Sequence, residues 1–151
     1  MSTTANPVVV GVDGAEASNG ALRWAMDEAL VRGCPLHVVN AWDFEPLADW
    51  RETTVQQAQA ESEALIGEAV RAVSAGRTEL PEIVQRSLRG YAAEVLEKVS
   101  EGAALLVVAS HTGHWMRQIV LGSTSMHVVR HAHSPVVVIP VTDREPAEAA
   151  R

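Results

Sequence analysis

The sequence predicts a single α/β domain built on a parallel sheet with helices on both faces. Five short runs rich in Val, Ile and Leu alternate with four longer stretches whose apolar residues recur at helical spacing. This β-α-β-α succession is typical of a parallel sheet, because each strand needs a crossover to reach the next. The length of 151 residues suits one hydrophobic core. We expect residues 7–141 to form the domain, with a disordered N-terminus at 1–6 and a flexible tail at 142–151.

Two strands and two helices are expected in the first half of the chain. The first strand is PVVVGVD, residues 7–13, a β-branched run that ends at a Gly-Asp-Gly turn. A helix follows over residues 17–32 and ends at a glycine. PLHVVNA, residues 35–41, is the second predicted strand. Residues 53–74 are predicted as a longer helix, after a loop over residues 43–52.

Three strands and two helices are expected in the second half. Residues 82–88 are predicted as the third strand, followed by a turn and a helix over residues 92–100. ALLVVA, residues 104–109, is apolar throughout and is the best candidate for the centre of the sheet. A fourth helix is predicted over residues 123–132, and PVVVIP, residues 135–140, as the last strand.

A ligand site is expected at the carboxyl ends of the strands, where ligands bind in open parallel sheets. The residues that follow strands there are Asp13, Ala41 and the loop residues 110–113. The carboxylate of Asp13 could accept a hydrogen bond from a ribose or from an adenine amino group. A lone Val-Asp-Gly is also typical of a turn or a helix cap, so both roles stay open for Asp13.

The start of the last predicted helix reads Gly-Ser-Thr-Ser, residues 122–125. A helix N-terminus presents unpaired N–H groups and a partial positive charge, which suit a phosphate. Gly122 would let a ligand approach the backbone closely, and the three hydroxyls add donors. Ser and Thr are also ordinary N-cap residues, so these residues alone leave open whether the segment binds an anion or caps a helix.

Charge and composition limit the partners and the location. The formal net charge of −7 argues against a nucleic-acid partner, which would need clustered Lys and Arg. No apolar run approaches the roughly 20 residues of a membrane span, so no membrane partner is expected. The N-terminus MSTTANP lacks the features of a signal peptide, and Cys34 is the single cysteine. We therefore expect a cytoplasmic protein.

Metal binding and catalysis are not expected. His127 and His131 lie four residues apart on the last predicted helix, a spacing compatible with a metal. No Cys or Asp lies close to them, no HExxH motif occurs, and the helix is expected to expose a polar face instead. No Ser-His-Asp arrangement, carboxylate pair or base placed to activate water can be argued. We therefore expect no catalytic residue and no enzyme.

Five segments together resemble the universal stress protein family: VVVGVDGAEAS, ALRWAMDEALVRG, PLHVVNAW, ALLVVASH and LGSTSMHVVRHAHSPVVVIP. The resemblance covers almost the whole chain, residues 7–141. It implies a flavodoxin-like, adenosine-binding domain with a five-stranded sheet in the order 3-2-1-4-5. It also implies a homodimer in which the last strands, residues 135–140, pair across two chains.

Many members of that family bind ATP through a motif written G-x2-G-x9-G-(S/T). Its last part is present here as Gly122-Ser123, but the spacing places Ala109 and Thr112 where the first two glycines belong. Ala109 is tolerable with a negative φ, whereas Thr112 would be strained if the loop required a positive φ. A loop shifted by one residue could give that conformation to Gly113 instead.

The resemblance implies two sets of contacts with a bound nucleotide. The adenosine contacts would be Gly11, Val12, Asp13 and the backbone at Ala41. The phosphate contacts would be Ala109, Ser110, Thr112 or Gly113, Gly122, Ser123 and Thr124, with Mg²⁺ screening the phosphates. The resemblance also makes Ser123 and Ser125 candidate phosphorylation sites.

Two functions are compatible with this pattern. The first is a regulatory homodimer of the stress response that binds ATP through the degenerate motif A-x2-T-x9-G-S. The alternative is a nucleotide-free dimeric stress protein that acts as an interaction scaffold, and Thr112 favours it. An adenylating enzyme on a related fold would carry a Gly-rich SGGxDS loop after the first strand, where this chain has GVDGAEAS.

Overall fold

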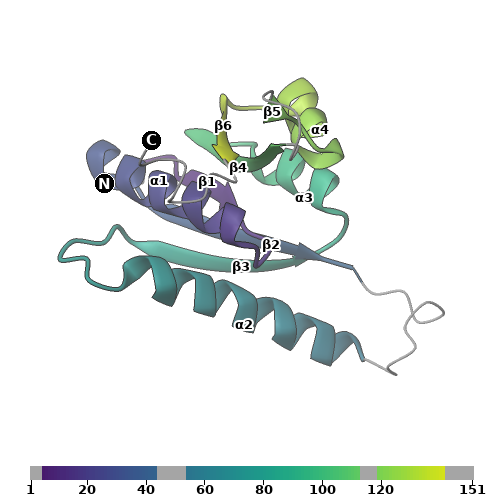
Figure 1. Ribbon diagram of the computed structural model, residues 1–151, viewed down its shortest axis with the longest axis horizontal. Helices are drawn as coiled ribbons and strands as arrows, with labels where there is room; N and C mark the ends of the chain where they lie inside the picture. Colours follow the sequence, from purple (N-terminus) through teal and green to yellow (C-terminus); the bar gives the residue numbers. More distant parts are fainter. Residues whose placement is uncertain (1–4, 44–53, 113–118, 142–151) are drawn as a thin grey trace, which may run out of the picture.

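The computed structural model describes residues 5–43, 54–112 and 119–141 (Figure 1). The predicted parallel sheet and its order are confirmed. From one edge to the other, the five parallel strands are β3 (Ile83–Arg89), β2 (Leu36–Trp42), β1 (Val8–Gly11), β4 (Leu105–Thr112) and β6 (Val136–Val141). Numbered along the chain among themselves, these strands follow the order 3-2-1-4-5.

Two pairs of helices cover the two faces of the sheet. One face carries α1 (Glu16–Arg32) and α2 (Val55–Ser74), and the other carries α3 (Ala92–Val99) and α4 (Ser123–His131). In Figure 1, α2 runs alongside β3, and α3 lies next to α4. Each connection between successive parallel strands along the chain therefore contains one helix, as the alternation of elements in the sequence predicts.

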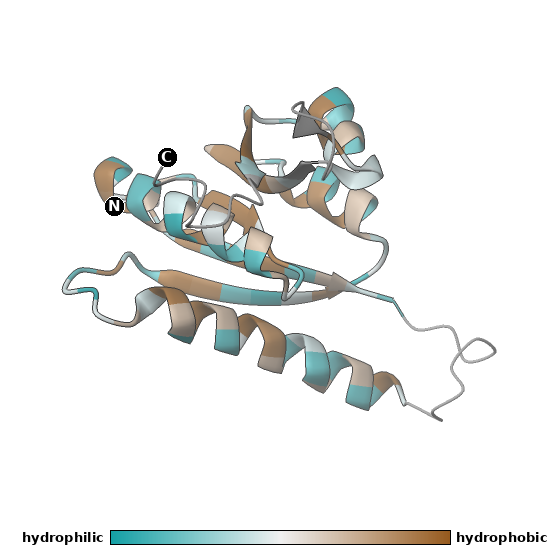
Figure 2. Cartoon of the chain, in the orientation of Figure 1, coloured by the Kyte–Doolittle hydropathy of each residue, from teal (hydrophilic) through white to brown (hydrophobic). Residues whose placement is uncertain are grey.

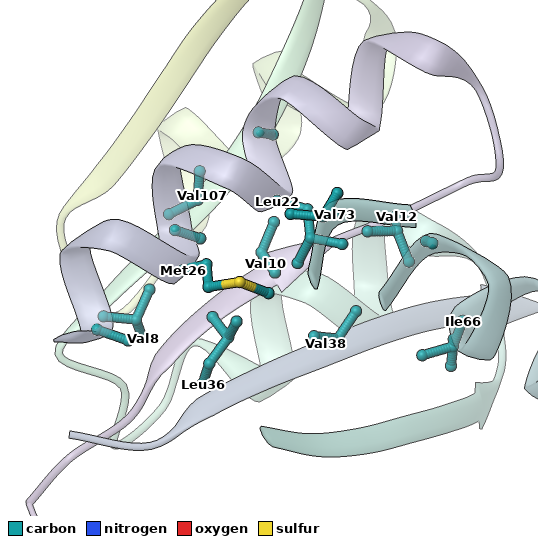
Figure 3. Packing of buried hydrophobic residues seen from close by; sticks show 14 of the residues in the cluster. Val8, Val10, Val12, Leu22, Met26, Leu36, Val38, Ile66, Val73 and Val107 are labelled. Carbon is teal, nitrogen blue, oxygen red and sulfur yellow. The ribbon is translucent and has the colours of Figure 1, made fainter. Parts of the chain in front are cut away.

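The core has two parts because successive residues of a strand point to opposite faces. Val8 and Val10 of β1 pack with Leu22 and Met26 of α1 in the larger part (Figure 3). Val9, between them, packs in the smaller part under α3 and α4. In Figure 2, α2 alternates between brown and teal along its length, as expected for a helix that buries one face against a sheet.

Local signals in the sequence set the helix ends. Gly33 adopts φ 65° at the end of α1, and its N–H donates to the carbonyls of Ala29 and Leu30. Thr54 caps α2 through a capping box with Gln57, in which each side chain accepts a hydrogen bond from the other residue's backbone N–H.

The end of β4 differs from the prediction. Residues 110–112 were expected in a loop but belong to the strand, because β6 pairs with β4 as far as His111. A short strand that was not predicted, β5 (Ile119–Val120), also pairs antiparallel with His111 and Thr112. Gly113 lies outside the described residues, as do 1–4, 44–53 and 142–151, so the predicted terminal segments stay predictions. Within the described ranges, no helix has the length and hydrophobicity to span a membrane.

Candidate functional site

A cavity of about 280 Å³ lies at the carboxyl ends of the central strands, where the sequence predicts a ligand. It opens between the turn after β1, the end of β2, the middle of β4 and the starts of α3 and α4. Most of the predicted ligand contacts line it: Gly11, Val12, Asp13, Ala41, Ala109, Gly122, Ser123 and Thr124. The expected adenosine and phosphate contacts thus meet around one space.

Two predicted contacts, Ser110 and Thr112, are not part of the described cavity lining. Ser110 lies in β4, is 1% exposed and does not line the cavity. Its hydroxyl makes no hydrogen bond to a described residue. Thr112 is the last residue of β4 and pairs with Ile119, an extended conformation that β-branched residues favour. Gly113 falls outside the part of the chain that the structure describes.

The turn after β1 is held by Asp13. Its Oδ1 accepts a hydrogen bond of 2.9 Å from the N–H of Ala15, and its own N–H donates to Ser18 Oγ at 3.3 Å. Gly14 follows with φ 86°, which only glycine adopts readily. Asp13 therefore serves the turn, as one reading of the sequence predicts. Its Oδ2 accepts no hydrogen bond from a described residue, and Asp13 as a whole is exposed and lines the cavity.

Apolar side chains on the α3 and α4 face of the sheet form the floor of the cavity. Val39 of β2, Val108 of β4 and Leu96 of α3 meet there beside Gly11. A Cβ built on Gly11 would lie 3.2 Å from both methyl carbons of Leu96. The absence of a side chain at Gly11 therefore lets Leu96 pack closely against β1 at the floor, and this apolar floor suits a flat apolar group such as a base.

The start of α4 forms the opposite wall. Gly122 is its N-cap, and no side chain caps the helix. Gly122 has φ −66°, and a Cβ built on it would meet no described atom within 4 Å. Neither the backbone conformation nor packing against the described residues therefore requires glycine there. A helix N-terminus without a cap, open to a cavity, is a place where backbone N–H groups can bind an anion.

The two candidate phosphorylation sites differ in accessibility. Ser123 is exposed at the mouth of the cavity. Ser125 is 6% exposed, and its Oγ donates a hydrogen bond of 3.3 Å to the carbonyl of Ala109. Ser125 thus attaches α4 to β4, and only Ser123 offers its hydroxyl to solvent.

The described lining of the cavity carries one charged residue, Asp13, and no Lys or Arg. A phosphate at α4 would therefore be held by backbone N–H groups and hydroxyls. Because these groups do not neutralise a polyphosphate, a bound cation would be needed to screen it. The net charge of −7 adds to this requirement.

The histidines of α4 lie outside the cavity. His127 Nε2 lies 2.8 Å from Glu97 Oε1 of α3, and the rings of His127 and His131 are 4.6 Å apart. His127 therefore joins α3 to α4, rather than only exposing a polar face as the sequence suggests. Among the described residues, no group of three or more His, Cys, Asp or Glu side chains could hold a metal ion.

Sequence reasoning missed several residues that line the cavity, among them Leu96 and Asn40. Leu96 is one of several apolar residues on the buried face of α3. The sequence does not indicate which of them contacts the end of β1. Asn40 lies inside a strand, with 7% of its surface exposed, and its side chain bonds to the backbone at Val12. A polar residue within the apolar run of β2 was the available signal.

Comparison with known proteins agrees with this architecture. The model of the universal stress protein family matches residues 4–140. Universal stress protein Rv2623 of Mycobacterium tuberculosis is 33% identical over 140 residues, which cover 87% of this chain and 46% of that protein. Universal stress protein Mb2019 of Mycobacterium bovis is 33% identical over 156 residues, covering 91% of this chain and 49% of that protein. The chain thus spans about half the length of these curated relatives.

Solved structures share the fold. A universal stress protein in complex with cAMP superimposes with a TM-score of 0.67 and 23% identity, covering 93% of this chain and all of that one. The universal stress protein from Archaeoglobus fulgidus in complex with dAMP gives a TM-score of 0.62 and 22% identity, covering 91% of this chain and 99% of that one.

Proposed function

Because this chain belongs to the universal stress protein family, we propose that it is a regulatory protein of the stress response that binds an adenine nucleotide. ATP, with Mg²⁺ screening its phosphates, is the ligand that we propose. Occupancy of the cavity would change the surface that the protein presents to its partners. The proposal is one of binding without catalysis, since Asp13 is the only titratable group in the described cavity lining and its Oδ1 already serves the turn.

One observation carries the proposal: the uncapped start of α4 and an apolar floor face the same cavity. The base would lie on the floor formed by Val39, Leu96 and Val108. The free Oδ2 of Asp13 would accept a hydrogen bond from a ribose hydroxyl. The phosphates would then reach the N–H groups at the start of α4.

The solved relatives support an adenine ligand. Two solved structures with this fold are complexes with cAMP and with dAMP, both of which combine an adenine base with a single phosphate. The replaced motif glycines do not argue against binding on backbone grounds. Ala109 and Thr112 lie in the extended strand β4, where neither needs a positive φ.

Calorimetric titration with ATP, with and without Mg²⁺, tests the proposal. We expect micromolar binding that requires Mg²⁺, and loss of binding in Gly122→Asp. The new carboxylate would occupy the empty space at the start of α4 and repel phosphate. Thr78→Asp is the matched control, because it adds the same charge to an exposed bend before β3, at the opposite end of the sheet. A folded, nucleotide-free protein that binds no ATP would contradict the proposal.

A homodimer is the assembly that we propose. Among the described strands, β6 pairs only with β4, so its other edge is available for a second chain. Sedimentation equilibrium tests this directly. A dimer that persists without nucleotide binding would favour the second candidate function, a nucleotide-free interaction scaffold, for which the loss of two motif glycines is the supporting observation.

A further inference from the structure

A series of hydrogen-bonded polar side chains runs from half-buried Ser87 of β3, through α2, to the cavity. Ser87 Oγ of β3 lies 2.7 Å from Ser62 Oγ of α2, which lies 2.7 Å from Asn40 Oδ1 of β2. Asn40 Nδ2 then donates a hydrogen bond of 2.8 Å to the carbonyl of Val12. Asn40 and Ser62 are 7% and 4% exposed, so these groups depend on one another for hydrogen bonds.

The donor and acceptor roles along this hydrogen-bonded series follow from its last acceptor, the carbonyl of Val12. A backbone carbonyl only accepts, so the amide nitrogen of Asn40 must face Val12. Asn40 Oδ1 must then accept from the Ser62 hydroxyl, and Ser62 Oγ must accept from the Ser87 hydroxyl. The surroundings are apolar: Val12, Val38 and Ile66 belong to the same core cluster (Figure 3). An amide at Asn40 without these partners would be costly in such surroundings.

The bond from Asn40 holds one side of a single peptide group. The carbonyl of Val12 and the N–H of Asp13 belong to the same peptide plane. Asn40 donates to that carbonyl, and the N–H donates to Ser18 Oγ of α1 at 3.3 Å. The plane between Val12 and Asp13 is therefore held from β2 on one side and from α1 on the other. Its orientation determines where the backbone and carboxylate of Asp13 point.

We infer that Asn40 is a positioning residue for the cavity. Its amide orients the peptide between Val12 and Asp13, and thereby directs the Asp13 carboxylate toward a bound nucleotide. The inference rests on the proposed function, since it concerns the same cavity. Asn40 therefore affects the affinity for the ligand, whereas Ser62 and Ser87 contribute to the stability of the fold.

Asn40→Asp tests this role with little change of shape. The carboxylate keeps an acceptor for Ser62 but replaces the donor to Val12 with an oxygen that repels the carbonyl. We expect the affinity for ATP with Mg²⁺, measured by calorimetry, to fall by about tenfold or more. We also expect hydrogen exchange at the amides of Asp13 and Ala15 to accelerate more than exchange in the core of β1. Asn40→Ala, which removes the donor without adding a charge, serves if Asn40→Asp does not fold.

Ser87→Ala is the matched control, because it shortens the same hydrogen-bonded series at its far end and leaves the bond to Val12 in place. We expect its affinity to stay within about twofold of the natural protein. Natural affinity and uniform exchange in the folded Asn40 variants would overturn the inference, as would an equal loss of affinity in Ser87→Ala. If the natural protein binds no ATP, the proposed function fails, and the exchange at Asp13 and Ala15 alone decides whether Asn40 orients the turn.

Discussion

At the scale of single residues, the floor of the cavity depends on the glycine at position 11. Gly11 ends β1 with φ in the ordinary range, so its backbone does not demand glycine. The need comes from Leu96, whose two methyl carbons would lie 3.2 Å from a Cβ at this position. A contact this short forces one of the two groups to move. Close packing against Leu96 at the cavity floor, rather than chain geometry, therefore explains this glycine.

Gly11→Val should therefore disturb the floor of the cavity. We expect the affinity for ATP to fall by about tenfold or more, because the valine side chain would force Leu96, which lines the cavity, to move. Calorimetry of the folded variant measures the loss. In the matched control Gly20→Ala, the new Cβ meets no atom within 4 Å. It should leave affinity unchanged and raise stability by about 0.5–1 kcal/mol, because it replaces glycine inside α1. Undiminished binding by Gly11→Val would place the ligand elsewhere.

The residues of the site were predictable in part. Asp13, Gly122 and Ser123 stand directly after a strand or at the start of a helix, so local sequence indicates their place at the carboxyl edge of the sheet. Leu96 and Asn40 reach the cavity through packing between elements far apart in the chain. A single sequence does not specify such contacts, and neither residue differs locally from an ordinary core position, apart from the polarity of Asn40.

At the scale of elements, the periodicity of apolar residues predicted the bounds of most strands and helices. The parallel strands and the helices begin and end within a few residues of their predicted bounds. The exception is β4, which was expected to end at Ala109 and continues to Thr112. Its last residues pair with β6 and with the short strand β5. Strand length here is set by the neighbours, and a two-residue strand leaves no periodic signal in the sequence.

The strand pair β2 and β3 makes stability depend on pH. Burial lowers the pKa of His37 below its ordinary value of 6.5, the nearby positive charge of Arg86 lowers it further, and Glu82 opposes both. The buried Nδ1 of His37 makes no hydrogen bond to a described residue. The unfolded chain therefore binds a proton at a higher pH than the folded protein does, and protonation favours unfolding.

We expect the free energy of unfolding to fall as the pH drops through about 6.5 and to stop falling from this cause once the pH is below the lowered pKa of the folded protein. His37→Gln should remove this part of the pH dependence. The free energy of unfolding is measured for both proteins by urea unfolding at several pH values. These should span roughly pH 8 to pH 5, the range in which histidine titrates. Parallel curves for the two proteins would show that His37 does not contribute.

At the scale of the whole molecule, charge and fold act together. The parallel sheet brings the ends of β1, β2 and β4 to one edge, and α4 points its N-terminus at the same place. The protein as a whole is acidic, with a formal net charge of −7. A polyphosphate would therefore approach against the overall charge, and within the described cavity lining the helix start is the feature that favours it. This balance is the reason for expecting a strong dependence on Mg²⁺.

The most direct test of the central claim is to locate the bound nucleotide by titrating ¹⁵N-labelled protein with ATP and Mg²⁺ and following the backbone amide signals. We expect the largest shifts at the start of α4, residues 122–125, and in the turn after β1, residues 11–13, with saturation at a single affinity. Signals that do not move at millimolar nucleotide, or shifts gathered at a surface away from these two segments, would contradict the account and leave the start of α4 as an ordinary helix end.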